Sequence, residues 1–217
     1  MATLLVKEFF SKVDDLSLCI PYLLPVLVAR LNAEDLEGLD SVTEEAQPQS
    51  NQKPLVMIDP PENSEAVRLV IAEIVTIMVS STVFDCMRSY TQEIVNILRA
   101  ICMDPAGAVI IEGCQGLKEF AISGNEQLIH FCEVMGRSLF NAFVHKHAKV
   151  RMAGLRSLFD VMLCGKFKYS HTIISMMVGF RDPNIVPIKD FYEWSTKLNY
   201  FASFVADRSV AVRQCFY

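Results

Sequence analysis

The stretch HKHAKVRMAGL, residues 145–155, decides how this sequence is interpreted. It crowds basic and titratable side chains into a few residues and then passes into the apolar rhythm of a helix. Such a stretch fits a metal or catalytic site, a basic surface for an acidic partner, or a structural joint between helices. Because a joint recurs wherever a fold repeats, the deciding question is whether the same pattern occurs elsewhere in the 217 residues.

The pair Val150-Arg151 has counterparts elsewhere in the chain. Val67-Arg68 follows the letters PPENSEA, and Val212-Arg213 follows ADRSVA. Val109-Ile110 follows MDPAGA in the same phase but without the arginine. Successive valines stand 42, 41 and 62 residues apart, so the last interval holds one unit and an insertion, which we place in GFRDPNIVPIKDFYEW, residues 179–194.

Between these joints apolar residues recur at i, i+3 and i+4. This period indicates helices over most of the chain, including a periodic helical segment over Val83 to Met103 and a helix over Gln127 to Val144. Few stretches alternate with a period of two, so no sheet is expected. A period near 40 residues with two helices per unit is typical of HEAT and armadillo repeats. The sequence therefore predicts an all-α fold, an α-solenoid of antiparallel helix pairs (HEAT/armadillo-like repeats) that share one core.

Each part of the joint has a structural task in such a stack. Asp104-Pro105 suits a helix start, as N-cap and first helical residue. The valine enters the shared core, and the adjacent arginine faces away, where it can bond carbonyls of the turn or an acidic side chain of the next repeat. Arg68, Arg151 and Arg213 would then form a ladder, which Ile110 interrupts.

The chain divides into three parts. We expect an N-terminal helix pair over residues 1–38 and an acidic, Pro-rich flexible loop over 39–62, better explained as an insertion between helices than as a docking segment. Residues 63–217 hold the HEAT-like repeats, with an insertion near 178–198 and an incomplete last repeat. We therefore expect a piece of a longer array that associates or frays at its C-terminal end.

Composition argues against several classes of partner. A formal net charge of −5 argues against nucleic acid, and no apolar run reaches the ~20 residues of a membrane span. The seven cysteines are odd in number and none are spaced C-x-x-C, which favours buried, reduced thiols in a cytosolic protein. His145 and His147 lack a paired motif that would complete a metal site, so we expect no metal and no cofactor.

No catalytic pattern emerges either. The only hint of a phosphate loop is Gly165-Lys166, which lacks the upstream glycine and the following Ser or Thr. Asp85 and Asp160 stand alone on expected helices, and nothing resembles a nucleophile elbow. The sequence predicts a non-enzymatic protein without a small-molecule substrate.

Protein binding is the remaining class. Lys146, Lys149, Arg151 and Arg156 form either a basic surface patch or ordinary solvated turn charges. Trp194 is the best candidate for an exposed anchor, because it lies in the insertion that breaks the period. The second helices should line the concave side and expose Glu65, Arg68, Glu112, Lys118, Glu119, Lys149, Arg151 and Arg156. The candidate protein-binding or joint residues are Arg68, Lys149, Arg151, Arg156, Trp194 and Arg213.

Several joints also resemble a known family. LFNAFVHKHAKVRMAGLRSLFDVML, residues 139–163, resembles the repeat joints of the HEAT-repeat dynein axonemal assembly factor, in which a helix ends in a His-x-His-like turn and restarts with Lys/Arg-Val-Arg-x-Ala. ADRSVAVRQC, residues 206–215, is similar to the next joint. VPIKDFYEWSTKLNYFASFVADRS, residues 186–209, is similar to an insertion between them. Ile110 and Val186-Pro187 depart from the family's pattern.

The resemblance implies a cytoplasmic factor for the preassembly of axonemal dynein arms before their delivery to cilia. It implies axonemal dynein chains and chaperones as partners, no catalytic residues, and Arg68, Arg151 and Arg213 as joint residues. The same fold also serves scaffolds of other pathways, such as nuclear transport, phosphatase scaffolds or chromosome organisation. Composition does not separate these from dynein arm assembly.

Overall fold

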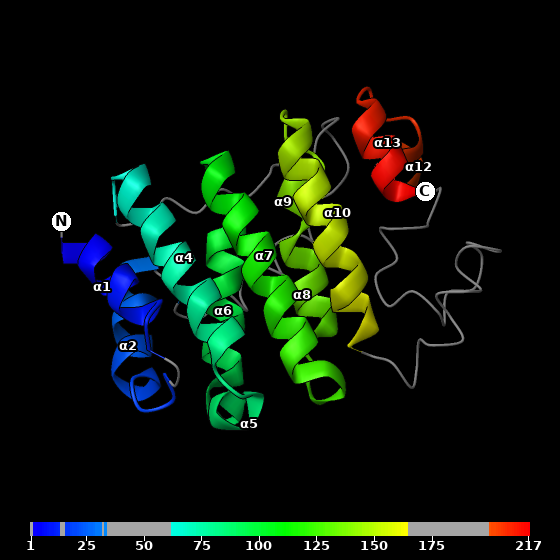
Figure 1. Ribbon diagram of the computed structural model, residues 1–217. Helices are drawn as coiled ribbons and strands as arrows, with labels where there is room; N and C mark the ends of the chain where they lie inside the picture. The colour runs from blue at the N-terminus through cyan, green and yellow to red at the C-terminus, as the bar shows by residue number, and fades with distance from the viewer. Residues whose placement is uncertain (1, 14–15, 32, 34–61, 165–199) are drawn as a thin grey trace, which may run out of the picture.

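Two rows of helices make up the computed structural model of this chain, which describes residues 2–13, 16–31, 33, 62–164 and 200–217 (Figure 1). The α-helices are α1 (Ala2–Phe10), α2 (Ile20–Leu31), α4 (Glu65–Ser81), α5 (Phe84–Met87), α6 (Thr91–Cys102), α7 (Gly107–Gly124), α8 (Cys132–Ser138), α9 (Phe140–Phe143), α10 (Ala148–Leu163), α12 (Tyr200–Val205) and α13 (Val210–Phe216). Two short 3-10 helices, η1 (Arg88–Tyr90) and η2 (Asn125–Leu128), precede α6 and α8. No strand occurs within these described ranges.

The helices alternate between the rows along the chain. One row consists of α1, α4, α7, α10 and α13, each packed against the next, and it crosses Figure 1 from the N-terminus to the C-terminus. In the other row, α2 packs against α6 and α6 against α8. Phe143 of α9 then meets Phe204 of α12, with ring centroids 5.1 Å apart. The predicted all-α solenoid of stacked helix pairs is confirmed.

The core lies between the rows and continues from pair to pair. The joint valines Val109, Val150 and Val212 are 1%, 2% and 0% exposed, whereas Val67 is only partly buried. The two rows approach closely at α7, where a Cβ on Gly113 would lie 2.7 Å from Cγ2 of Ile101 on α6. Such a contact is too short for a carbon pair, so the glycine is what allows α7 to pack this closely.

The periodic segment predicted over Val83 to Met103 is helical, but it is divided into α5, η1 and α6. The buried side chain of Thr91 stabilises the break between η1 and α6. Its hydroxyl donates a hydrogen bond of 2.8 Å to the carbonyl of Arg88, which closes a tight turn ahead of α6. Threonine hydroxyls compete in this way with the regular bonding of a helix.

The single helix predicted over Gln127 to Val144 is wrong, because η2, α8 and α9 occupy this range. Ser138 donates its hydroxyl to the Val134 carbonyl at 2.8 Å, and the N–H of Leu139 bonds the Gly136 carbonyl at 3.1 Å. This tightening of the last turn of α8 redirects the chain into α9.

Some expectations fall on parts of the chain outside the described residues. They include the loop predicted over 39–62, apart from Glu62, and the insertion predicted near 178–198 with Trp194. The helix pair predicted over 1–38 contains α1 and α2. The three-part division of the chain stays a prediction.

Candidate functional site

The turns that connect the rows share one hydrogen-bonding pattern. The residue five positions before the core valine is Glu62, Asp104, His145 or Asp207. Its side chain accepts a hydrogen bond from the backbone N–H two residues further on, at 3.0, 2.7, 3.1 and 2.7 Å respectively. Donors near a helix start lack partners inside the helix, so this bond stabilises the turn. The predicted N-cap role of Asp104 is wrong, because the N-cap of α7 is Ala106, whose N–H Asp104 accepts.

The arginine that follows the core valine bonds two turns at once. Nη1 of Arg68 donates to the Glu62 carbonyl at 2.9 Å, within its own turn. Nε and Nη2 donate to the two carboxylate oxygens of Asp104, in the next turn, at 2.6 and 3.2 Å. The Arg68 and Asp104 side chains are only 6% and 4% exposed. The hydrogen bond to Asp104 raises the pKa of Arg68 above its usual value, so this buried guanidinium stays charged.

Arg151 repeats this arrangement two joints later, beyond the joint that carries Ile110. Its Nη1 donates to the His145 carbonyl at 2.7 Å, and Nε and Nη2 bond the Asp207 carboxylate at 2.6 and 2.7 Å. Burial alone would raise the pKa of Asp207, but hydrogen bonds from Arg151 and from the Ser209 N–H lower it below its usual value. Because this bidentate pair joins α10 to α13 directly, only one stack interval separates Val150 from Val212.

The series of arginine–aspartate ion pairs is interrupted at one interval, where both the arginine and the aspartate are replaced. Ile110 is 3% exposed at the position of the arginines, and the turn that follows carries His145 in place of a carboxylate. A Cβ on Gly107 would lie 3.1 Å from Cε1 of His145, so the imidazole packs against this glycine. Burial, and then the charges of the neighbouring cations, lower the pKa of His145. A neutral, partly buried ring therefore replaces the ion pair at this interval.

Arg213 completes the series on one side only. Its Nη1 donates to the Asp207 carbonyl, as the other arginines do within their own turns. No carboxylate in the described part of the chain lies within ion-pair distance of its guanidinium. Arg213 is half-buried.

The expectation that Arg68 and Arg151 lie exposed on the concave surface is wrong, because they are 5% and 6% exposed and held in ion pairs. The expected bonds of these arginines to turn carbonyls and to an acidic side chain of the next repeat are present, but the sequence interpretation did not name Asp104 and Asp207 as the acidic partners. A usable signal existed, since both aspartates stand five residues before a core valine.

The other candidates lie elsewhere. Lys149 and Arg156 are exposed on α10, while Glu112, Lys118 and Glu119 of α7 are half-buried. The ladder brings Arg68, Arg151 and Arg213 into one series of joints but does not bring Lys149 or Arg156 into the ion pairs. Trp194 lies outside the described residues. A role in protein binding stays a prediction for all of these residues.

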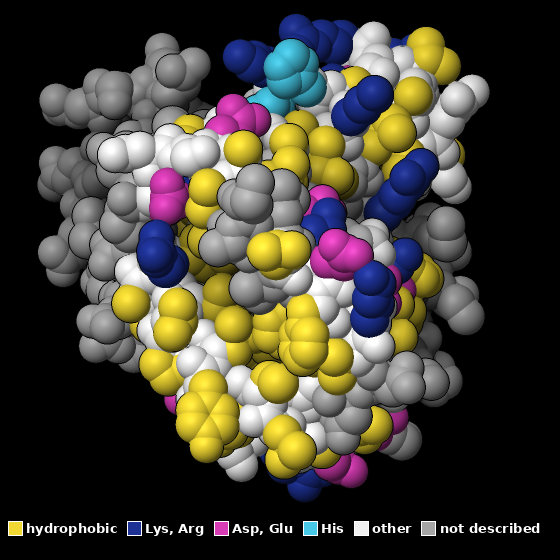
Figure 2. Space-filling view, turned by 60° about the vertical axis from the view of Figure 1, so that its left-hand side comes forward, with side chains coloured by type: hydrophobic (Ala, Val, Ile, Leu, Met, Phe, Trp, Pro, Cys, Tyr) yellow, Lys and Arg dark blue, Asp and Glu magenta, His cyan; other side chains and the backbone are white. Residues whose placement is uncertain are grey.

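An apolar groove of about 530 Å³ occurs at the N-terminal end of the stack. Leu5, Phe9, Leu18 and Tyr22 line it and are 63%, 58%, 83% and 81% exposed. Figure 2, which turns this end of the stack toward the viewer, shows hydrophobic side chains over much of the face. The groove can take apolar side chains but offers no chemistry.

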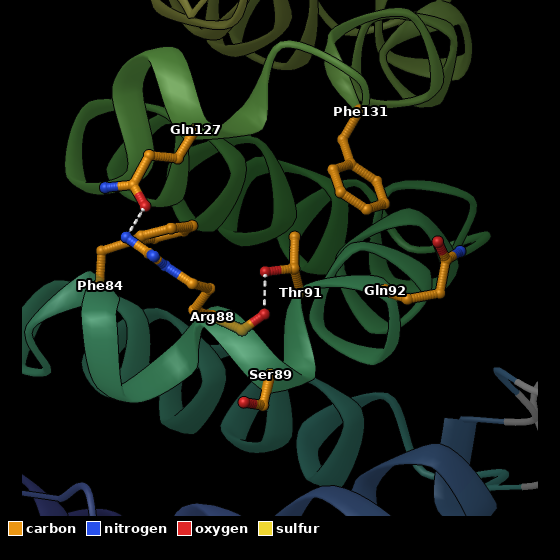
Figure 3. A pocket seen from close by; sticks show the side chains of 7 residues that line it. All are labelled: Phe84, Arg88, Ser89, Thr91, Gln92, Gln127 and Phe131. Atoms are coloured by element: carbon orange, nitrogen blue, oxygen red, sulfur yellow. Dashed lines mark hydrogen bonds between the residues drawn. The ribbon is translucent and has the colours of Figure 1, made fainter.

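A second pocket, of about 410 Å³, lies between residues of α5, η1, α6 and η2 (Figure 3). Arg88 reaches from η1 toward η2, where it bonds Gln127, and it also donates to Asp85 at 2.9 Å. Phe84 and Phe131 supply aromatic walls. No acidic or basic side chain other than Arg88 lines the pocket, so its hydroxyls have no general base beside them.

Four of the cysteines behave as structural thiols. None of the seven forms a disulfide, and Cys102, Cys114, Cys132 and Cys164 are buried. A hydrogen bond with Cys114 and burial raise the pKa of Cys102, and burial raises the pKa of Cys164 to about 12. Thiols with such pKa values stay protonated and react slowly as nucleophiles.

Other kinds of site are not found in the described ranges. The described residues hold no group of three or more side chains that could ligate a metal. Among the described helices, none combines the length and apolar character that a bilayer span requires.

Comparison with known proteins adds one finding. A family model described as dynein axonemal assembly factor 5-like, TPR repeats, matches residues 52–179, more than half of the chain. The match includes the joints at Val67, Val109 and Val150. TPR units usually span about 34 residues, whereas these valines stand 42 and 41 residues apart. No curated protein and no solved structure gives a significant match.

Proposed function

The chain belongs to the dynein axonemal assembly factor 5-like family of helical repeats, and from this premise we propose that it is a non-enzymatic scaffold for the preassembly of axonemal dynein arms. Its partners would be axonemal dynein chains and chaperones, met in the cytoplasm. The family match carries this proposal, because its description names the process.

The architecture supports a binding role over a chemical one. Stacked helix pairs make an extended surface on which successive units can each contribute a few contacts to one long partner. The polar groups buried at the joints already bond one another, as in the Arg68–Asp104 and Arg151–Asp207 pairs. They are therefore committed to holding the stack, and the exposed side chains between them are free for recognition.

Co-purification from cells that are building motile cilia tests the proposal. The tagged full chain should recover axonemal dynein chains together with chaperones, at levels well above those obtained with an unrelated helical-repeat protein carrying the same tag. Recovery of phosphatase subunits or nuclear-transport cargo in their place would refute it. Absence of the transcript from ciliating cells, with abundance in cells that never make motile cilia, would refute it as well.

A further inference from the structure

We propose that Lys146, Lys149, Arg156 and Arg208 form a docking surface for an acidic peptide segment of a partner protein. This inference deepens the proposed scaffold role and rests on it. The four residues, called here the basic joint surface, are all exposed.

The four side chains belong to neighbouring parts of the stack. Lys146 lies in the turn before α10, and Nη2 of Arg208 bonds its backbone carbonyl from the next joint. Lys149 and Arg156 lie seven residues apart on α10. Seven residues make about two helical turns, so these two side chains lie on one side of the helix, about 10 Å apart along its axis.

The fold does not require these charges, as the equivalent positions of the other joints show. The counterparts are Asn63 and Pro105 for Lys146 and Arg208, Ala66, Ala108 and Ala211 for Lys149, and Glu73 and Gln115 for Arg156. Neutral or acidic residues thus serve the same structural positions within one molecule. Packing therefore does not account for the charges of Lys146, Lys149 and Arg156, whereas Arg208 also bonds the neighbouring turn.

The basic joint surface forms no direct ion pair within the described part of the chain. No carboxylate of the described residues lies within ion-pair distance of any of the four cations. Asp207 forms its bidentate ion pair with Arg151, and the charge of Arg208 acts on this carboxylate only at longer range. Figure 2 shows Lys and Arg side chains clustered beside the histidines at its upper edge.

An acidic peptide fits this surface better than nucleic acid or an anionic membrane. Nucleic acid and anionic membranes bind to extended basic surfaces. The whole chain instead carries a net charge of −5, which repels a long polyanion. A peptide with a few carboxylates spaced about 10 Å apart, as at i and i+7 of a helix, can pair with Lys149 and Arg156 without approaching the acidic remainder.

Fluorescence anisotropy with the full chain tests the proposal. The probe is a synthetic helical peptide with glutamate at every third or fourth position, and its comparison is the same peptide with glutamine. The variant combines Lys146→Asn, Lys149→Ala and Arg156→Gln, which are residues that the chain itself uses at the equivalent positions, so folding is retained. The control variant, with the same change in net charge, combines Lys12→Ala, Arg30→Ala and Arg88→Ala, all exposed cations elsewhere.

We expect the glutamate peptide to bind the wild type and to bind the triple variant about ten-fold more weakly, since several ion pairs are lost. Binding should weaken as salt rises, and the control variant should stay within about two-fold of the wild type. Equal weakening in both variants would overturn the proposal in favour of net charge alone. Preference for the glutamine peptide, for duplex DNA or for vesicles containing phosphatidylserine would overturn it too. If the wild-type chain fails to co-purify with axonemal dynein chains, the scaffold role is refuted. If it fails only to bind the glutamate peptide, the docking surface alone is refuted.

Discussion

The buried ion pair between Arg68 and Asp104 makes the sharpest prediction about stability. Arg68→Met keeps the length of the side chain but removes its charge, and Asp104→Asn keeps an oxygen that can accept the Ala106 N–H. Each single change leaves the other partner's charge in a site that is 6% or 4% exposed. Breaking a buried ion pair in this way lowers the free energy of unfolding by about 3–5 kcal/mol. The loss should be larger for Asp104→Asn, because the guanidinium left behind cannot lose its proton.

The double variant should be more stable than the sum of the single changes predicts. With both charges gone, no ion is left unpaired, and the remaining cost is that of lost hydrogen bonds, about 1–2 kcal/mol. With at least about 3 kcal/mol lost in each single variant and at most about 2 kcal/mol in the double variant, the coupling free energy of the pair is at least about 4 kcal/mol. Urea unfolding, followed by circular dichroism at 222 nm, measures the free energy of unfolding of the wild type, the two single variants and the double variant. Amide exchange should place the loss of stability near α4 and α7, since units in a solenoid contact only their neighbours.

The exposed pair of Arg88 and Asp85 provides the matched control. These side chains are 62% and 72% exposed, so Arg88→Met and Asp85→Asn should each cost less than about 1 kcal/mol. The reasoning is refuted if Asp104→Asn costs no more than Asp85→Asn, or if the effects of Arg68→Met and Asp104→Asn simply add.

Further predictions concern the gap, the helix contacts and acid. Ile110→Arg alone should lower the free energy of unfolding by about 3–5 kcal/mol in thermal unfolding, because it buries an unpaired charge. Adding His145→Asp should restore at least half of this loss, and no recovery would argue against the ladder. Gly113→Ala should cost about 1–3 kcal/mol in urea unfolding, because its Cβ would meet Ile101 at 2.7 Å, whereas Gln115→Ala on the exposed side of α7 should cost little. Because the pKa of Asp207 is lowered in the folded chain, its contribution to stability is present above the ordinary pKa of 3.8 and is lost as the pH falls through the pKa of the folded state. Asp207→Asn should therefore flatten the dependence of the free energy of unfolding on pH below pH 4, and an unchanged dependence would contradict this.

The repeat was predictable because it depends on spacing. Helix pairs that share a core must place a core residue at the same point of every unit, so the valines recur at intervals of 42 and 41 residues. The partners of the arginines were less accessible. A turn aspartate such as Asp104 has the same sequence signature whether it caps its own helix or receives a guanidinium from the preceding repeat, because only the stacking of units brings Arg68 within reach.

Burial of the joint arginines explains the largest error of the sequence interpretation. Charged residues at a helix start are exposed in most proteins, and this expectation placed Arg68 and Arg151 on the surface. In a solenoid the start of one helix is covered by the turn of the next unit, so the exposure of Arg68 and Arg151 depends on residues 36 and 56 positions away. The pairing of Ile110 with His145 follows the same logic, since an unpaired carboxylate or guanidinium at that interval would be costly to bury. Joint charges without such a partner, like those of the basic joint surface, are therefore the ones available to another protein.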